Sequence, residues 1–229
     1  MRDDICTIPV SEVFEVNDGC PICRMKKTVE THIIDYIMGA AMMEPDVRIE
    51  TNKKGFCREH FRDMLSHRGR LALALMIETH LDEQKKAIFD GKLFNSAVSK
   101  AKKVSRLNES CFICDKIEWG MSRMVETLYR CYETEMDFRE LFNNQKCFCL
   151  PHYEMLVNNL DKKKMRNYGD AFLKNISRFT EENIERLSAD IKNYCKVYNY
   201  QGNKENCDWE NAKDSVERSI NFLTAQNVE

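Results

Sequence analysis

The sequence predicts an all-α protein built from two tandem repeats. Turn-forming residues are scarce, since the 229 residues include only 8 glycines and 4 prolines, and this scarcity favours long helices over many short strands. Apolar residues recur at steps of three and four along most of the chain, which is the period of one helix face. The organisation follows from a third observation: the phrase Phe-Cys-x2-His-aromatic occurs twice, at 56–61 and 148–153.

Each phrase belongs to a longer motif, C-x2-C, a long insert and then C-x2-H. The first motif contains Cys20, Cys23, Cys57 and His60, and the second contains Cys111, Cys114, Cys149 and His152. Three thiolates and one imidazole suit the tetrahedral preference of Zn²⁺. We therefore predict two zinc ions per chain, each held by the four ligands of one repeat, with each C-x2-C and C-x2-H pair opening a helix.

The likeness between the repeats extends beyond these ligands. The segment CPIC matches CFIC, and the triplet at 46–48 (DVR) matches the one at 137–139 (DFR). We interpret this as an internal duplication. Ordinary buried cysteines, or redox-active C-x2-C pairs, are the alternatives. Neither explains why Cys and His recur downstream at nearly the same distance.

The repeats predict four segments. A first zinc-clamped repeat covers residues 1–90, a linker helix covers 91–108, a second zinc-clamped repeat covers 109–200 and a C-terminal amphipathic helix lies within 201–229. Only CTIPV, at 6–10, has a pattern compatible with a short strand.

Prolines, glycines and the pattern of apolar residues predict the helices of the first repeat. Pro21 suits the first position of a helix that continues to about Ala40. Pro45 marks a break, and a short helical turn is expected at 46–52. A helix then begins at Cys57 and ends near Gly69. The segment 70–89 is strongly apolar, so we expect a helix buried on most sides.

The remaining helices follow the same reasoning. Apolar positions predict helices at about 94–104, 111–132, 149–161 and 164–195, and a last amphipathic helix at about 208–223. The polar stretch 201–207 is expected to be the loop before the last helix.

Composition restricts the classes of function. The formal net charge is −2 and the pI about 6.3, which weighs against a dedicated nucleic-acid domain. The longest apolar runs are too short to span a membrane, and the N-terminus has no apolar secretory segment. We therefore expect a cytoplasmic protein, in which 11 cysteines indicate metal binding more than disulfides.

Several segments resemble a known family. The stretches TIPVSEVFE, CPICRM, MEPDVRIETNKKGFCREHF and RLALALMIETHL are similar to an uncharacterised bacterial family of the DUF6062 type, over nearly the whole chain. The resemblance implies a bacterial, intracellular protein. It implies no activity, substrate or partner.

The leading interpretation is a structural-zinc module that binds a protein partner, with the oligomeric state left open. Four protein ligands leave no position for substrate water, which argues against an enzyme. If the chain were nonetheless an enzyme, the candidates would be Glu44, Asp46, Arg48 and Asn52, or His80 with Glu78 and Glu83.

Two further alternatives remain open. Basic residues at 100–106 and 161–166 motivate a nucleic-acid-binding regulator. Cys147, two residues before Cys149, motivates a redox-sensitive zinc switch.

Overall fold

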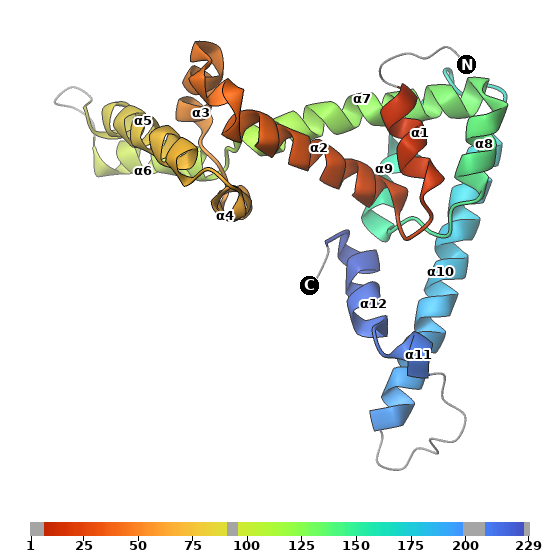
Figure 1. Cartoon of the computed structure of the whole chain (residues 1–229). Helices are drawn as coiled ribbons and strands as arrows, with labels where there is room; N and C mark the ends of the chain where they lie inside the picture. Colours follow the sequence, from red (N-terminus) through yellow and green to blue (C-terminus); the bar gives the residue numbers. More distant parts are fainter. Residues whose placement is uncertain (1–6, 91–95, 199–208, 227–229) are drawn as a thin grey trace. The chain divides into compact units, whose positions relative to one another are not determined.

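The computed structural model describes residues 7–90, 96–198 and 209–226, and within these ranges the chain is helical and has no strand (Figure 1). The first half contains α1 (Thr7–Glu15), α2 (Pro21–Met38), the 3₁₀ helix η1 (Ala40–Met43), α3 (Pro45–Lys54), α4 (Arg58–Ser66), α5 (Arg70–Phe89) and α6 (Ala97–Asn108). The second half contains α7 (Phe112–Thr134), α8 (Met136–Asn143), α9 (Leu150–Asn158), α10 (Gly169–Tyr198), α11 (Trp209–Ala212) and α12 (Ser215–Thr224). The predicted all-α class is confirmed.

Three local expectations were wrong. Residues 7–10 belong to helix α1, so the segment CTIPV is not a strand where it is described. The long helix α10 begins at Gly169 rather than near 164, because 161–168 form turns. The tail forms two helices, α11 and α12, instead of one. The loop expected at 201–207 lies outside the described residues.

Helix α5 is less buried than its composition suggests. Ala72, Leu73 and Met76 lie in the core, whereas Leu71 and Leu81 are 73% and 62% exposed. The expectation of a helix buried on most sides was therefore wrong. Only one face of α5 packs, because its contacts lie mainly with α3.

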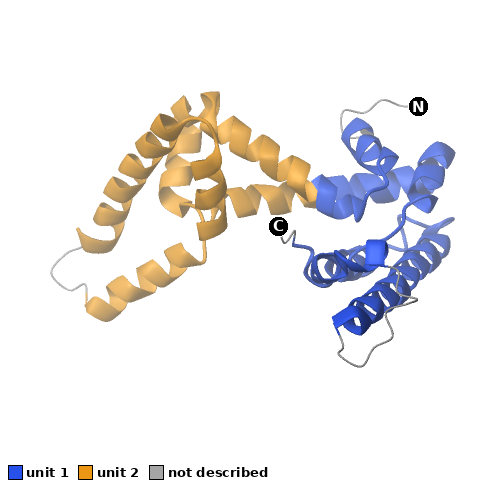
Figure 2. Ribbon diagram, turned by 60° about the horizontal axis from the view of Figure 1, so that its bottom comes forward, with its two compact units in different colours: residues 1–25, 123–229 blue, residues 26–122 orange. Residues whose placement is uncertain are grey.

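The helices form two compact units, coloured separately in Figure 2. Unit 1 comprises residues 1–25 and 123–229, and unit 2 comprises 26–122. Both divisions fall inside a helix, one in α2 and one in α7. Contacts and repeats thus partition the chain differently, and the predicted repeat boundaries stay a prediction.

Unit 1 is built around an aromatic cluster that joins α1, α7, α8 and α10. The Phe14 and Phe138 rings lie 5.2 Å apart, and Phe142 lies 4.9 Å from both Tyr132 and Phe172. All five side chains are almost completely buried. Such ring pairs add about 0.5–1.5 kcal/mol each beyond the area that they bury. The cluster therefore fixes α8, and with it the segment that leads to Cys149.

Unit 2 packs α3 along α5 over a core that includes Ile37, Met64 and Met76. Polar contacts join the two helices. The Arg48 guanidinium donates to the Leu75 carbonyl oxygen at 2.7 Å, and the Thr79 hydroxyl donates to Asn52 Oδ1 at 2.8 Å. Among the described residues, no helix is both long enough and apolar enough to cross a membrane.

Candidate metal centres

All eight predicted ligands lie at helix starts. Cys57 and Cys149 are the N-cap residues of α4 and α9. Cys20 and Cys111 directly precede α2 and α7, and their carbonyl oxygens accept the first hydrogen bond of each helix. The second ligand of each pair lies three residues later, in the first turn. Helix N-termini carry partial positive charge, which stabilises thiolates there.

The structure gathers these residues into two clusters, each confined to one unit. Site A, in unit 1, comprises Cys20, Cys23, Cys149 and His152. Site B, in unit 2, comprises Cys57, His60, Cys111 and Cys114. In each cluster the four potential ligand atoms all lie within 4.8 Å of one another.

The predicted grouping of ligands was therefore wrong, although each cluster has the predicted composition of three cysteines and one histidine. Site A combines the C-x2-C pair of the first repeat with the C-x2-H pair of the second. Site B combines the remaining two pairs, again one from each repeat. Sequence proximity favoured pairing within a repeat, but the packing of helix starts pairs the motifs crosswise.

Hydrogen bonds to backbone carbonyl oxygens just ahead of the ligands bring the paired helix starts together. In site A, the Asn17 side chain donates to the Asn144 carbonyl oxygen at 2.6 Å, and Gln145 donates to the Phe14 carbonyl oxygen at 2.7 Å. In site B, the Phe112 amide donates to the Gly55 carbonyl oxygen at 2.9 Å. The chain entering each C-x2-C pair is thus fastened to the chain entering the other repeat's C-x2-H pair.

The distances suit a tetrahedral ion. In site A, Cys23 Sγ lies 3.6 Å from Cys149 Sγ and 3.3 Å from His152 Nδ1. In site B, Cys57 Sγ lies 3.9 Å from Cys114 Sγ, and Cys114 Sγ lies 3.5 Å from His60 Nδ1. A tetrahedral Zn²⁺ with ordinary bond lengths separates two sulfurs by about 3.8 Å and a sulfur from a nitrogen by about 3.6 Å. Both clusters can therefore hold a metal ion with small adjustments.

The two clusters differ in their surroundings. In site A, Cys149 is buried and packs with Leu187 of α10 and Phe222 of α12, and Cys20 and Cys23 pack against the same group. In site B, His60 and Cys111 are buried, but Cys114 is exposed. The C-terminal helices thus cover site A, whereas site B includes one exposed cysteine.

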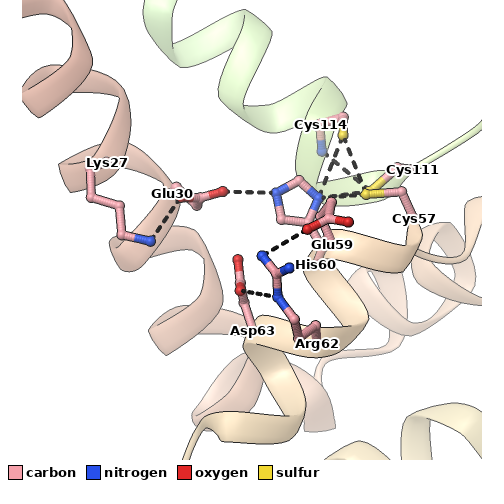
Figure 3. A network of polar contacts seen from close by, with 9 residues as sticks. All are labelled: Lys27, Glu30, Cys57, Glu59, His60, Arg62, Asp63, Cys111 and Cys114. Carbon is pink, nitrogen blue, oxygen red and sulfur yellow. Dashed lines mark hydrogen bonds and ion pairs between the residues drawn. The ribbon is translucent and has the colours of Figure 1, made fainter. Parts of the chain in front are cut away.

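Site B also includes a carboxylate that the sequence analysis missed. Glu30 Oε1 lies 3.1 Å from His60 Nε2, while His60 Nδ1 faces the sulfurs (Figure 3). The hydrogen bond with His60 holds the pKa of Glu30 at about 2, so the carboxylate is charged. Carboxylates in this position orient metal-bound histidines and fix their tautomer. Lys27 pairs with Glu30 at 3.1 Å.

No motif marks Glu30, since it lies in the middle of a helix. The equivalent position of the second repeat, counted from the cysteines, is Met121. Among the described residues, His152 has no carboxylate partner. The only available signal was spacing: Glu30 lies seven residues after Cys23, about two helical turns, which places it on the same face of α2.

The three cysteine sulfurs of site B lie so close together that they cannot all ionise readily unless a cation offsets their charge. Burial would raise the pKa of Cys111, but its hydrogen bond with His60 lowers that pKa to about 6. Burial and the adjacent Cys111 sulfur raise the pKa of Cys114 to about 12. One thiol therefore ionises readily while its neighbour resists, because like charges oppose each other. A bound divalent cation would remove that conflict.

The loops that precede the two C-x2-H pairs differ. Gly55 has φ 63°, and a Cβ there would lie 2.8 Å from the His80 ring. Its counterpart Cys147 does not have a positive φ. Burial raises the pKa of the Cys147 thiol to about 11, so it is a poor thiolate. Cys147 also lies outside both ligand clusters.

Four of the residues considered for an enzyme, Glu44, Arg48, Asn52 and His80, make hydrogen bonds within unit 2. Arg48 and Asn52 join α3 to α5, and His80 Nδ1 lies 2.8 Å from the Asn52 carbonyl oxygen. Glu44 accepts a hydrogen bond from the Tyr36 hydroxyl at 3.0 Å. The two metal-ligand clusters do not include any of the residues considered for an enzyme.

The basic stretches are partly engaged within their own units. Lys103 donates to the Ala87 carbonyl oxygen at 2.6 Å, and Lys100 lies over the Phe89 ring. Lys164 pairs with Glu126 at 2.6 Å. These contacts reduce the cationic surface available to a phosphate backbone.

Comparison with known proteins identifies a family for this chain. The model of a family described as a family of unknown function (DUF6062) matches residues 1–229. Neither a curated protein nor a solved structure matches the chain.

Proposed function

The chain belongs to this family of unknown function, and we propose that it is a helical interaction module held together by two structural zinc ions, one at each crosswise site. The family is described as one of unknown function, so the proposal rests on the chemistry of the two clusters. Each ion would join helix starts that are far apart in the sequence. Site A joins α2 to α9, and site B joins α4 to α7.

One observation carries the proposal: in both clusters, four donor atoms from three cysteines and one histidine lie within 4.8 Å of one another. Such a set closes the coordination sphere and leaves no position for a reacting water. Soft thiolates with one imidazole select Zn²⁺ over hard cations such as Mg²⁺ and Ca²⁺. A structural role therefore accounts for the donors better than catalysis does.

Metal binding would contribute directly to folding. Structural zinc sites in small domains supply about 10–16 kcal/mol of apparent binding free energy at pH 7. In this chain that free energy would act between helices rather than within one hairpin, because each site combines one ligand pair from each repeat. Removal of the metal should thus loosen the ends of four helices together.

The test is metal content and its structural effect. Elemental analysis of the purified chain should find two zinc ions per chain, and a strong chelator should lower the thermal unfolding midpoint. Cys195→Ser provides the control, since Cys195 is exposed and lies outside both clusters. It should retain both ions. A chain that binds no zinc, or that keeps its unfolding midpoint after complete metal removal, would exclude structural zinc.

A groove on unit 2 supports a protein partner. Helices α2 and α7 line it with mostly apolar side chains, and its volume is about 260 Å³. Its rim includes Tyr36 and Trp119, which are 51% and 64% exposed. Exposed aromatic residues of this kind are enriched at protein interfaces.

Purification from the native host tests the partner. Proteins that accompany the wild-type chain should be lost from a Trp119→Ala variant and kept by Leu81→Ala, which alters an exposed apolar residue on α5. Equal recovery with both variants would place the interaction elsewhere.

A further inference from the structure

The two sites differ in how far their cysteines are exposed to solvent. Of the nine cysteines that the structure describes, two are exposed, Cys114 and Cys195. Cys114 alone of these two belongs to a ligand cluster. In site A, by contrast, Cys149 is only 2% exposed and packs against residues of α10 and α12. Of the cysteines in the two clusters, Cys114 is therefore the most accessible to a reagent from solvent.

Cys57 supplies a second sulfur close to Cys114. Cys57 Sγ lies 3.9 Å from Cys114 Sγ, and Cys57 is half-buried. Cys111 is buried, and its sulfur accepts the backbone N–H of Cys114 at 3.5 Å. A hydrogen bond from an amide stabilises a thiolate and lowers its nucleophilicity. The sulfur best placed to react with an oxidised Cys114 is thus that of Cys57.

We propose that Cys114 is a modification site for hydrogen peroxide, and that its oxidation releases the metal of site B while site A keeps its own. This inference rests on the proposed function, because it takes both sites to hold zinc. It also moves the redox-sensitive position from Cys147, suggested by the sequence, to the solvent-facing ligand of the other cluster.

The chemistry needs peroxide alone as the oxidant. The Cys114 thiolate attacks one peroxide oxygen, the O–O bond breaks and hydroxide leaves, which gives a sulfenic acid and, after protonation, water. The Cys57 thiolate then attacks the Cys114 sulfur, forms the S–S bond and expels hydroxide, which becomes a second water. The two sulfurs lose two electrons and the peroxide gains them. Zn²⁺ leaves because two of its four ligands are gone.

The first experiment uses the full-length, zinc-loaded chain. Peroxide is added, zinc release is followed with a coloured chelator and the disulfides are mapped by mass spectrometry. We expect one ion per chain to leave at least ten times faster than the other, with a Cys57–Cys114 disulfide, and reductant plus zinc to restore the site. Equal release rates, faster oxidation of Cys149, or a Cys111–Cys114 disulfide would overturn the proposal.

Two variants separate the possible causes. Cys114→His keeps a zinc ligand but removes the exposed thiolate, so its site B should retain zinc in peroxide. Cys195→Ser removes the other thiol that is exposed among the described cysteines, and it should release zinc like the wild-type chain. A fast release from Cys114→His, or a protected Cys195→Ser, contradicts the assignment.

A measurement on the unaltered protein covers the case in which Cys114→His does not load with zinc. Brief treatment of the zinc-loaded chain with N-ethylmaleimide should label Cys114 before any other ligand. Labelling of a site A ligand first would contradict the inference. Metal content before treatment distinguishes the two failures: a chain without zinc contradicts the proposed function, whereas two ions released alike contradict only this inference.

Discussion

At the scale of single residues, Glu30 distinguishes one site from the other. Its carboxylate holds the Nε2–H side of His60, so that Nδ1 presents its lone pair to the metal position. Replacing such a carboxylate usually weakens metal affinity by about 10- to 100-fold. We expect Glu30→Gln to weaken zinc binding at site B by this factor and to leave site A unchanged, as measured by chelator competition.

Glu59→Gln is the matched control for that variant. Glu59 lies next to His60 in the sequence, but it is exposed and pairs with Arg62 at 2.7 Å. Exposed pairs contribute about 0–1 kcal/mol, and Figure 3 draws the Glu59 carboxylate paired with Arg62. Equal loss of zinc from both variants would mean that Glu30 acts through general charge rather than through His60.

Gly55 carries a second prediction at this scale. Its φ of 63° and ψ of −157° lie in a region that is almost restricted to glycine, and a Cβ would meet the His80 ring at 2.8 Å. We expect Gly55→Ala to lower the unfolding free energy by about 1–3 kcal/mol in denaturant titration. In Gly169→Ala the new Cβ meets only ordinary contacts, the nearest at 3.4 Å. If this control loses as much stability, backbone strain at Gly55 is not the cause.

The sequence could predict the eight residues that gather into the two clusters, because metal chemistry restricts residue type and spacing. The chain contains two C-x2-C pairs and two C-x2-H pairs. This combination leaves few interpretations other than metal binding. Glu30 could not be predicted, because a carboxylate acting through a histidine needs only proximity in space. The sequence shows that residue 55 is a glycine, but only the structure explains why a glycine is needed there: its φ is positive and a side chain would collide with His80.

At the scale of elements, the C-terminal helix α12 covers site A. Phe222 is 7% exposed and packs with Cys149 and Leu187. Phe222→Ala would remove this cover and open a cavity, a change that costs about 3–5 kcal/mol in a well-packed core. We expect faster zinc loss from site A to a chelator and unchanged loss from site B.

The adjacent Leu223 provides the matched control for α12. Leu223 is 57% exposed, so Leu223→Ala keeps the cover while it shortens a neighbouring side chain on the same helix. Its zinc release should equal that of the wild-type chain. Accelerated release from both variants would indicate general fraying of α12 instead of a lost cover.

Helix starts were the most predictable elements, and helix partners the least. Proline and the ligand pairs indicated that α2, α4, α7 and α9 begin at their motifs, and the structure confirms each of these starts. Which start meets which depends on contacts such as Gln145 to Phe14, 131 positions apart. The apolar composition of α5 likewise concealed that only its α3-facing side is buried, because residue type alone does not show which face has a partner.

At the scale of the whole molecule, metal binding should couple the chain's stability to pH. In the metal-free clusters the pKa values of Cys114 and Cys149 are raised to about 12, so both thiols are protonated at pH 7. For Cys114 the main cause is burial, and for Cys149 it is the hydrogen bond with Cys20. Each thiol must lose its proton when the ion binds.

The sign of the pH effect follows from that proton release. Acid supplies the protons that compete with the metal, so zinc affinity and the stability that it contributes fall as the pH decreases and grow as it increases. Calorimetric titrations in buffers of different ionisation enthalpy should show at least one proton released per ion at pH 7. Binding without proton release would contradict this account of the clusters.

The crosswise pairing of the repeats is the central claim about the molecule, and the zinc content of two double variants tests it most directly. If the ligands pair as in sites A and B, Cys20→Ser with Cys149→Ser damages one site and should leave one zinc ion per chain. Cys20→Ser with Cys57→Ser then damages both sites and should leave none. The opposite result, one ion in the second variant and none in the first, would show that each repeat binds its own metal and would contradict the account.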